Sequence, residues 1–530
     1  MPTFNYDGHQ VAFEQGETII AACARAGLEI PHYCWHAGLS APANCRMCLV
    51  EILPKPGTRA VSLDIVELDD ATGQYKTVQK PKLQPACQMA AAEGLEVKGD
   101  TSPHVHQARK SVQEFLLLNH PVDCPICDQS GECKLQDYWL EHGQFKKRMR
   151  DEPVHKPKAV SFGPTIVYDA ERCVMCTRCV RFMEEVAKDP VLEMRERGNL
   201  NEIAVAPGRQ LEGHYTFMTE HVCPVGALTT KDFRFKARVW FLRTAKSVCQ
   251  GCATGCNAHL DYDPRYNRAY RYRPRDNMAV NKFWMCDEGM VTYTRAHEGR
   301  VLDSRANGAS ASNAAALAEA NQLFSGVNKS GVAFVLSAQH SLEDNWALRQ
   351  FATTLFGSNA FYVSGAKNGY ADDILISADK NSNTAGVKQL VPDAKPFEAL
   401  VADVAAGRVR HIIALGGDAP SDASALKAAT LVTLASHEGA LTNVARVVLA
   451  TTSWAEQSGS YVNVKGLTQV SDAALAPQGS SKPAWQQLAD LSRVLGSDAS
   501  WTKLKQIRTL LDAESPARPA AAASPATPAE

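Results

Sequence analysis

The chain of 530 residues has no cysteine after Cys286, although it has 16 cysteines up to and including that residue. It also lacks long hydrophobic runs. Apolar stretches such as 332–336 and 412–415 are far shorter than the roughly 20 residues that span a bilayer. The formal net charge of −1 gives no basis for binding nucleic acid or an anionic membrane surface. The first 17 residues lack the charged start and apolar core of a signal peptide. These absences predict a cytosolic chain whose membrane association would come only through partner subunits.

The cysteines occur as closely spaced pairs, which in a reducing compartment indicates metal binding rather than disulfide bonds. Cys23 stands apart and is expected to be a small buried hydrophobic residue. The others, with one histidine, form four consecutive sets of possible ligands: Cys34, Cys45, Cys48 and Cys87; His120, Cys124, Cys127 and Cys133; Cys173, Cys176, Cys179 and Cys223; Cys249, Cys252, Cys256 and Cys286. Four consecutive thiolate sites predict a path for electrons.

In the first set, one loop carries three cysteines and Cys87 is supplied from a distant point in the chain. Plant-type ferredoxins hold a [2Fe–2S] cluster in this way. The small residues at 37–43 suit a backbone that wraps around a cluster. The alternative for this set is a structural zinc site.

The second set contains only three cysteines, so a [4Fe–4S] cluster there needs a fourth ligand. Histidine can replace cysteine, and a neutral imidazole in place of a thiolate tends to raise the reduction potential. His120 stands shortly before Cys124. His104 and His106 are alternatives, and His120 is also consistent with an ordinary surface histidine.

The third set joins the beginning of one bacterial ferredoxin run, Cys173 to Cys179, to the end of a second, Cys223-Pro224. In two-cluster ferredoxins the last cysteine of each run ligates the cluster of the other run, so these residues complete one [4Fe–4S] site. A single zinc site does not explain this cross-pairing. The second site is missing all its ligands, because its positions hold Met183, Gly213, Thr216 and Thr219.

The fourth set has a spacing that suits either a [4Fe–4S] cluster or zinc, and its neighbours favour the cluster. Together the sets predict one [2Fe–2S] and three [4Fe–4S] clusters.

The pattern of apolar residues predicts a multidomain α+β front part followed by an α/β back part. The front part begins with strands, a hairpin turn at Asp7-Gly8 and a helix over 17–26. Further strands are expected at 61–66 and 74–78, and a helix at 106–118. After about residue 300, short strands alternate with Ala-rich helical stretches, which predicts a parallel sheet with strands at 331–337, 411–415 and 447–451.

The predicted organisation has six segments. They are a β-grasp [2Fe–2S] ferredoxin-like domain (1–100), a [4Fe–4S] domain with one histidine and three cysteine ligands (101–145), a bacterial-ferredoxin-like [4Fe–4S] domain (160–235), a further [4Fe–4S] domain (243–298), an α/β domain (300–510) and a disordered tail (514–530). The basic stretch 146–158 is interpreted as a linker or solvated surface, with a docking patch as the alternative. Gly416-Gly417 is weak evidence for a phosphate loop.

The front half resembles the large iron–sulfur subunit of respiratory complex I, in the bacterial form of NADH-quinone oxidoreductase. The resemblance rests on the order of the four sets, on Cys45-Arg46-Met47-Cys48, on residues 119–127 and on residues 223–228. It implies that His120 is a cluster ligand.

The resemblance also implies that a neighbouring NADH/FMN subunit delivers electrons to the [2Fe–2S] site, from which they pass to the third set and then to the second. They would leave for an iron–sulfur subunit that leads to quinone, with proton translocation in the whole complex. The fourth set would lie off this path. The implied location is the cytoplasmic side of a bacterial inner membrane.

The back half resembles the molybdopterin oxidoreductase fold, through residues 452–459 and 461–463. Catalytic members of that family carry lysine in Cys-x-Lys-Gly, whereas this chain has Cys286-Asp287-Glu288-Gly289, and no later cysteine follows. A scaffold without molybdopterin is therefore expected. The alternatives are a formate dehydrogenase catalytic chain, an iron-only hydrogenase and a zinc-bound structural protein. The first lacks a working pterin site, and the second lacks further cysteines.

Overall fold

The computed structural model describes residues 1–54, 62–69, 71–145 and 148–514. The chain divides into two compact units, Met1–Trp240 and Phe241–Ala522, and each is described by itself. The expected tail at 514–530 lies outside the described residues, except for Glu514. Within the described part, no helix is both long enough and apolar enough to cross a membrane.

The first unit begins with a mixed five-stranded sheet in the order β2-β1-β7-β3-β6. Its strands are β1 (Thr3–Tyr6), β2 (His9–Ala12), β3 (Leu49–Ile52), β6 (Gln84–Pro85) and β7 (Glu96–Lys98). Asp7 and Gly8 have φ values of 49° and 90°, and both residues of a type I′ hairpin turn need positive φ. The predicted turn is therefore confirmed.

Helix α1 (Ile19–Arg25) packs its apolar face against this sheet. The Thr18 hydroxyl accepts a hydrogen bond from the Ala21 backbone N–H, and Gly27 beyond the end has a φ of 77°. Cys23 is fully buried in the core, as predicted, and burial raises the pKa of its thiol to about 12.

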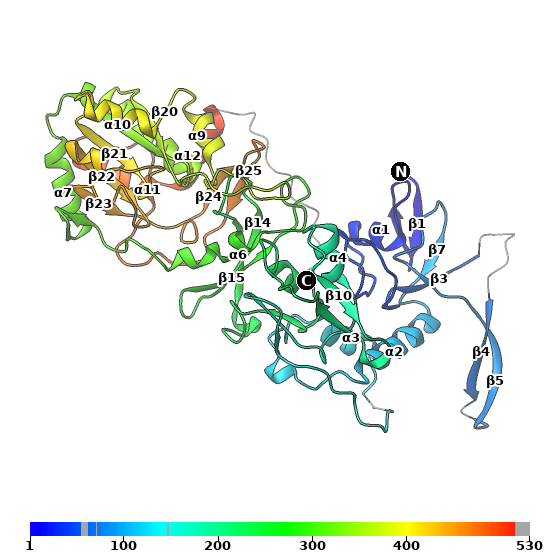
Figure 1. Ribbon diagram of the computed structural model, residues 1–530. Helices are drawn as coiled ribbons and strands as arrows, with labels where there is room; N and C mark the ends of the chain where they lie inside the picture. The colour runs from blue at the N-terminus through cyan, green and yellow to red at the C-terminus, as the bar shows by residue number, and fades with distance from the viewer. Residues whose placement is uncertain (55–61, 70, 146–147, 515–530) are drawn as a thin grey trace. The chain divides into compact units, whose positions relative to one another are not determined.

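The strands expected near 61–66 and 74–78 are present as β4 (Ser62–Asp69) and β5 (Gln74–Pro81). They pair only with each other, forming a two-stranded ribbon apart from the five-stranded sheet (Figure 1). The ribbon exposes the side chains of Val66 and Tyr75.

Helix α2 (Pro103–Leu117) confirms the helical spacing before Pro121. The 3-10 turn η1 (Cys124–Ile126) and helix α3 (Lys134–His142) follow it. Cys133 is the N-cap residue of α3, so this helix begins directly after a candidate ligand.

The ferredoxin-like part has a three-stranded sheet in the order β12-β9-β8 and a β10-β11 hairpin. Two short helices, α4 and α5, pack against each other. The bounds are β8 (Val160–Ser161), β9 (Ile166–Tyr168), α4 (Arg178–Glu185), β10 (Leu192–Arg195), η2 (Gly198–Leu200), β11 (Glu202–Val205), α5 (Phe217–His221) and β12 (Leu228–Thr230).

The second unit starts with the short turn η3 (Val239–Phe241), which straddles the unit boundary, and an antiparallel sheet of β13 (Arg243–Val248), β14 (Asn257–Asp263) and β15 (Arg268–Pro274). Helix α6 (Asp287–Val291) and the turn η4 (Thr292–Ala296) follow. Asp261 on β14 is buried between Arg271 and Arg273, which hold the pKa of its carboxyl well below its usual range despite burial.

The eight-stranded sheet of the second unit has the order β17-β16-β23-β22-β21-β18-β19-β20. The six strands from β23 to β20 are parallel, as predicted, whereas β16 and β17 are antiparallel at one edge. The bounds are β16 (Arg305–Ala306), β17 (Ala309–Ser310), β18 (Val332–Ser337), β19 (Phe361–Ser364), β20 (Lys395–Pro396), β21 (His411–Leu415), β22 (Thr430–Ala435) and β23 (Val447–Ala450).

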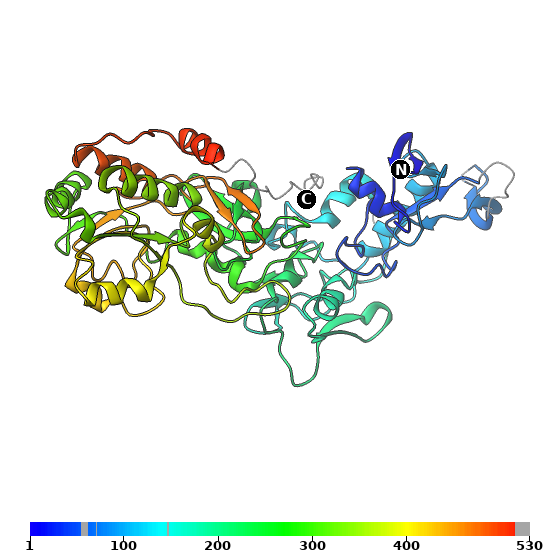
Figure 2. The ribbon, with the colours of Figure 1, turned by 90° about the horizontal axis from the view of Figure 1, so that it is seen from above.

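Helices cover both faces of this sheet (Figure 2). One face packs on α7 (Asn313–Phe324), α8 (Leu342–Phe351), α9 (Thr384–Leu390), α11 (Ala484–Val494) and α12 (Leu504–Glu514); the other packs on α10 (Phe397–Ala405) and η7 (Ser424–Ala428). The remaining elements are η5 (Lys329–Gly331), the π-turn Ala352–Phe356 and the hairpin of β24 (Gly459–Val462) and β25 (Thr468–Ser471). Because both faces are covered, β18 and β21 are almost entirely apolar.

Candidate metal centres and the links between them

The structure brings the first set together in the loop before β3 and the segment after β6. The Cys34 and Cys45 thiols form one hydrogen-bonded pair, and the Cys48 and Cys87 thiols form another. Each bond raises the pKa of the donor, Cys34 or Cys48, and lowers that of its partner, to about 5 for Cys45. The two pairs also interact with each other electrostatically, so the four thiols lie in one neighbourhood.

The third set lines one small apolar cavity, together with Tyr168 and Ile203. Cys173 and Cys176 lie on the loop that enters α4, and Cys179 lies in the first turn of that helix. Met175 and Thr177 have φ values of 52° and 61° and turn the backbone around the cavity. Cys223 follows α5 and closes the ring, as the cross-pairing of the two runs predicts. Its thiol is within hydrogen-bond distance of the Val225 carbonyl, 3.0 Å away.

Burial raises the pKa of the third-set thiols, to about 11 for Cys173 and Cys176 and about 12 for Cys223. A buried thiolate needs a nearby positive charge, which a bound metal centre supplies. The Tyr168 hydroxyl donates a hydrogen bond to Cys173 and accepts one from the Ile203 backbone N–H at 3.1 Å. The donor set therefore fits an iron–sulfur cluster.

The positions of the missing second ferredoxin site are filled by the protein itself. Met183 on α4, together with Thr216 and Thr219 at α5, is fully buried, whereas Gly213 lies in an exposed turn. The Thr219 hydroxyl donates to the Thr216 carbonyl at 2.7 Å. The Thr216 and Thr165 hydroxyls are 2.6 Å apart. This site holds hydrogen-bonded side chains in place of ligands.

The second set lies at the start of α3 and around η1. Cys127 is nearly buried, whereas Cys124 is exposed between Val122 and Ile126, which are 93% and 60% exposed. The Cys133 thiol interacts electrostatically with both other thiols, and burial raises its pKa to about 11.

The three candidate histidines lie in different surroundings. His120 is beside Arg172 and Asp123, and Arg172 also acts on the Cys127 thiol. His104 faces Glu51 and Lys80, and the His106 ring lies next to the His142 ring. Burial and Arg172 lower the pKa of His120 to about 4, so its imidazole is neutral and able to act as a ligand.

The fourth set, in the second unit, lines another cavity with Leu375 and Ile376. Backbone N–H groups point at two of its sulfurs: Gly251 to Cys249 at 3.4 Å and Gly289 to Cys286 at 3.3 Å. A Cβ on Gly289 would lie 3.1 Å from the Cys249 sulfur, so glycine lets α6 approach the set closely.

A single metal ion needs ligand atoms that lie close together. A tetrahedral zinc with Zn–S bonds of about 2.3 Å holds its sulfurs about 3.8 Å apart. We therefore consider groups of three or more His, Cys, Asp or Glu side chains whose ligand atoms lie within 4.8 Å of one another. Among the residues that the structure describes, Asp100, His106 and His142 form such a group. Within these described residues, no cysteine set forms such a group.

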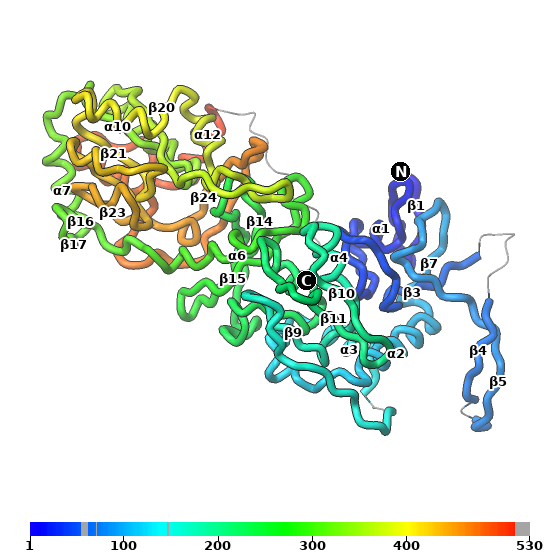
Figure 3. The backbone as a smooth tube through the Cα atoms, viewed as in Figure 1, coloured from blue at the N-terminus to red at the C-terminus, as the bar shows by residue number. Residues whose placement is uncertain are grey.

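Two buried arginines of α4 join the first set to the third. The Arg181 guanidinium donates to the Cys34 carbonyl at 2.6 Å, to the Cys176 carbonyl at 3.2 Å and to the Ser40 carbonyl. Arg178 donates to the Trp35 carbonyl at 2.5 Å. The loop around Cys34 therefore runs alongside α4 (Figure 3).

An ion pair and a close backbone contact join the third set to the second. Arg172, next to Cys173, donates to the carboxylate of Asp123, next to Cys124, at 2.9 and 3.1 Å. A Cβ on Gly226 would lie 2.2 Å from the Cys127 sulfur, so only glycine permits this approach. The third set is therefore a neighbour of both the first and the second.

The basic stretch is not simply a solvated linker. Lys158 binds Asp123 and Glu171 at 2.7 and 2.8 Å, and Lys156 donates to the Asn201 carbonyl at 2.6 Å. The carboxylates grouped around Arg172 and Lys158 attract these cations onto the ferredoxin-like part. Lys146 and Lys147 lie outside the described residues.

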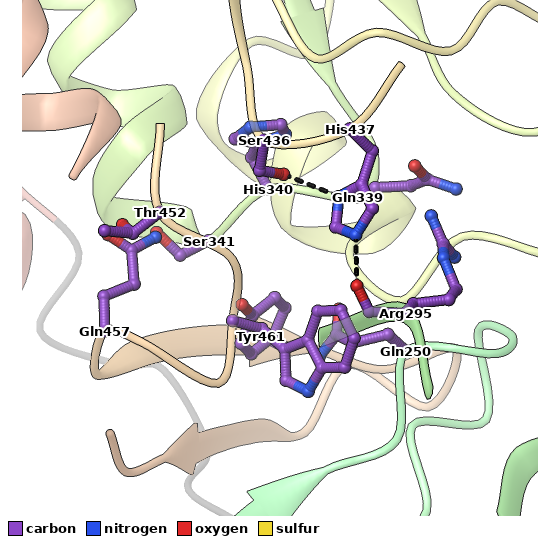
Figure 4. Close-up of a pocket in the computed structure, with 11 residues that line it drawn as sticks. Gln250, Arg295, Gln339, His340, Ser341, Ser436, His437, Thr452, Gln457 and Tyr461 are labelled. Atoms are coloured by element: carbon purple, nitrogen blue, oxygen red, sulfur yellow. Dashed lines mark hydrogen bonds between the residues drawn. The ribbon is translucent and has the colours of Figure 1, made fainter. Parts of the chain in front are cut away.

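The second unit has a polar pocket at the carboxyl ends of its parallel strands. It lies beside the point between β18 and β21 at which the strand order reverses, which is where α/β folds bind ligands. Figure 4 shows its His437 side chain bonded to Ser436 and Arg295. The His437 ring contacts the Ser436 hydroxyl at 2.9 Å and the Arg295 carbonyl at 2.6 Å, and His340 contacts the Ser337 hydroxyl at 2.9 Å.

A molybdopterin does not fit this pocket. Its cavity volume is about 40 Å³, whereas ligand sites typically have about 300–1,000 Å³. At the Gly416-Gly417 pair, a Cβ on Gly417 would lie 2.2 Å from the His437 carbonyl oxygen. The glycine pair serves close packing of two loops.

The linking residues were missed by sequence reasoning. Arg172 and Arg178 each adjoin a cysteine, and Tyr168 and Arg181 lie within five residues of one. Cationic and aromatic residues inside a cysteine run are a usable signal, but their partners lie some 50 to 150 residues away in the chain.

Four family models match the chain. They are a 2Fe-2S iron-sulfur cluster binding domain over residues 1–76, an NADH-ubiquinone oxidoreductase-G iron-sulfur binding region over 109–148, the ferredoxin-like domain of NADH-quinone oxidoreductase subunit 3 over 163–229, and molybdopterin oxidoreductase over 419–494.

Curated relatives include the G subunit of NADH-quinone oxidoreductase from Streptomyces coelicolor, 34% identical over 56% of this chain and 32% of the relative. The same subunit from Mycobacterium bovis is 32% identical over 68% of this chain and 42% of the relative. The mitochondrial NADH dehydrogenase [ubiquinone] iron-sulfur protein 1 of Solanum tuberosum is 37% identical over 57% and 37%. The chain thus spans about a third to two fifths of the length of these relatives.

A solved structure of NAD+-reducing [NiFe]-hydrogenase is 27% identical, covers 45% of this chain and 91% of that chain, and has a TM-score of 0.35.

The ferredoxin-like domains, the ligand sets and the family matches define a multicentre iron–sulfur protein of the electron-transferring oxidoreductases. More narrowly, the chain is similar to the G subunit of NADH-quinone oxidoreductase, and two of its segments match models of iron–sulfur domains of NADH-quinone oxidoreductases.

Proposed function

We propose that this chain is an electron-transfer subunit of the peripheral arm of an NADH:quinone oxidoreductase, complex I. The observation that carries the proposal is the contact of the third ligand set with both the first and the second in the first unit. Arg181 joins the first set to the third, and the contact of Gly226 with Cys127 joins the third to the second.

The proposed ligands are those of the four sets. Cys34, Cys45, Cys48 and Cys87 hold a [2Fe–2S] cluster; His120, Cys124, Cys127 and Cys133 hold a [4Fe–4S] cluster, as do Cys173, Cys176, Cys179 and Cys223, and Cys249, Cys252, Cys256 and Cys286. Such clusters supply one-electron transfer. His120 is preferred over His104 and His106 because Arg172 links its surroundings to Cys127.

The proposed domains follow the sets: 1–100, 101–145, 160–235 and 243–298, followed by an α/β domain over 300–510. We expect no molybdopterin in that domain, in view of the small polar pocket and of Glu288 at the position of the catalytic lysine.

The proposed partners are other complex I subunits, with the NADH/FMN subunit before the first set and the iron–sulfur subunit leading to quinone after the second. The exposed apolar residues Val122 and Ile126 beside Cys124 support a protein contact at the second set. The proposed location is the cytoplasmic side of a bacterial inner membrane, reached through the complex, which couples electron transfer to proton translocation.

Metal analysis and low-temperature EPR of the anaerobically purified chain test the proposal. We expect about fourteen irons, from one [2Fe–2S] and three [4Fe–4S] clusters. His120→Cys should shift one [4Fe–4S] signal and leave the others unchanged. About four zinc ions without iron would contradict the electron-transfer function, and stoichiometric molybdenum or tungsten would contradict the cofactor-free back half.

A further inference from the structure

A further group of possible metal ligands lies in the first unit, outside the four sets. Asp100 precedes α2, His106 lies in the first turns of α2, and His142 ends α3. Their ligand atoms all lie within 4.8 Å of one another. We propose that Asp100, His106 and His142 bind one zinc ion.

His142 carries the main argument. Its side chain is only 7% exposed, yet neither ring nitrogen has a hydrogen-bond partner. The nearest carboxylate oxygen, from Glu141, is 3.6 Å from Nε2, beyond hydrogen-bond distance. A buried polar group without a partner is costly, and native structures rarely leave one unexplained. A metal ion bound by one ring nitrogen provides the missing partner.

His106 is already oriented as a metal ligand. One ring nitrogen, Nε2, is 2.6 Å from the Asp100 backbone carbonyl. Histidine ligands typically donate their second ring N–H to such a carbonyl, which fixes the ring and leaves the other nitrogen with its lone pair. The His106 and His142 ring centroids are 6.3 Å apart.

The charges around the site suit a divalent cation. The fully buried Arg109 binds the Asp100 carboxylate and contributes one positive charge. Asp7 and Glu141 add two negative charges to that of Asp100. Asp7 is held there because its carboxylate accepts hydrogen bonds from the Asp100 and Thr101 backbone N–H groups. Glu29, further out, is paired with Lys134. The balance is two negative charges, which one divalent cation neutralises.

The donor atoms indicate which cation binds. Two imidazoles and one carboxylate are borderline ligands typical of zinc, whereas calcium and magnesium prefer oxygen alone. The ion would tie the start of α2 to the end of α3, the helix that begins at Cys133. The site has no thiolate, so it is chemically distinct from the iron–sulfur sets.

The test uses the full chain, purified anaerobically with its clusters, exposed to one equivalent of Zn²⁺ and then gel-filtered. We expect one retained zinc. X-ray absorption at the zinc edge should show nitrogen and oxygen neighbours at about 2.0–2.1 Å and no sulfur at about 2.3 Å. Sulfur neighbours would mean that zinc has entered a cysteine set, and absence of retained zinc would equally overturn the proposal.

Two variants locate the site. His142→Gln and the exposed His106→Gln should each lower zinc retention at least tenfold, with iron content and EPR signals unchanged. His104→Gln, on the same helix but outside the group, is the matched control and should retain zinc. If His142→Gln does not fold, its iron content will fall as well, and His106→Gln then decides. Undiminished zinc retention in His106→Gln would overturn the proposal.

Discussion

The third ligand set and the missing second ferredoxin site occupy equivalent places in one small domain, yet they have opposite contents. Cys173, Cys176, Cys179 and Cys223 surround a cavity, and the burial of their thiols calls for a bound positive centre. At the other site, Thr216 and Thr219 satisfy their own hydroxyls and leave nothing for a ligand to do.

A site that has lost its cluster therefore differs in more than its missing cysteines. The space must be refilled with side chains whose polar atoms find partners, since unsatisfied buried groups are costly. The polar pocket of the second unit shows the same pattern, because His340 and His437 bond to Ser337 and Ser436 rather than facing an open cavity.

The largest expected effect comes from removing a ligand of the third set. Cys176→Ser should lose about four irons and one [4Fe–4S] EPR signal, because a hard hydroxyl replaces a thiolate ligand. Thr219→Ser, at the filled site, is the control and should keep all irons. An unchanged iron content in Cys176→Ser would break the comparison between the two sites.

The next effect concerns the link between the first and third sets. Arg181→Met removes donors from the Cys34, Cys176 and Ser40 carbonyls, and each charge-assisted bond contributes about 1.5–3 kcal/mol. We expect the free energy of unfolding of the first unit to fall by about 3 kcal/mol, measured by denaturant titration under anaerobic conditions.

Arg209→Met is its control, because Arg209 forms a more exposed ion pair with Asp189. Such pairs contribute about 0–1 kcal/mol. Equal losses in the two variants would show that Arg181 does not hold the two sets together.

A third effect concerns the contact between the third and second sets. Gly226→Ala places a methyl group 2.2 Å from the Cys127 sulfur, and such overpacking costs about 1–3 kcal/mol. We expect lower thermal stability and a changed EPR signal of the second set. Gly331→Ala, whose added Cβ would meet its nearest atom at 3.9 Å, should change neither.

A fourth effect concerns the pH dependence of stability that the polar pocket of the second unit causes, in contrast to the cysteine cavities. Burial lowers the pKa of His340 to about 4, whereas an unfolded histidine has a pKa near 6.5. Since the unfolded state binds the extra proton first, stability falls as the pH drops from 6.5 toward 4, by about 2 kcal/mol at pH 5.

Calorimetry of the second unit's transition at pH 7 and pH 5 measures this loss. His340→Gln should reduce the pH dependence, whereas His9→Gln, at an exposed position in the first unit, should leave it unchanged. A pH dependence that persists in full in His340→Gln would mean that His340 is not the group that titrates.

The smallest effect is expected at the filled ferredoxin site. Thr219→Val keeps the side-chain shape but removes the bond to the Thr216 carbonyl, which costs about 1 kcal/mol. Iron content and all EPR signals should remain, because no ligand is touched. Loss of a signal would show that the site is not independent of the third set.

Much of the fold followed from local patterns. The Asp7-Gly8 turn, the helix before Pro121 and the parallel strands around 411–415 were predicted, because turn residues and hydrophobic periodicity act over a few neighbours. The separation of the β4–β5 ribbon from the main sheet was not, since strand pairing depends on distant segments.

Sequence spacing by itself predicted the cysteines of the four ligand sets and the loss of the second ferredoxin site, because the cysteines of each run are close neighbours in the chain. It left the histidine of the second set open among His104, His106 and His120. Only the tertiary structure brings the third set beside the first and the second, through Arg181 and Gly226, and brings Asp100, His106 and His142 together. These contacts join segments between about 40 and 150 residues apart, and only packing of the folded chain brings such segments within bonding distance.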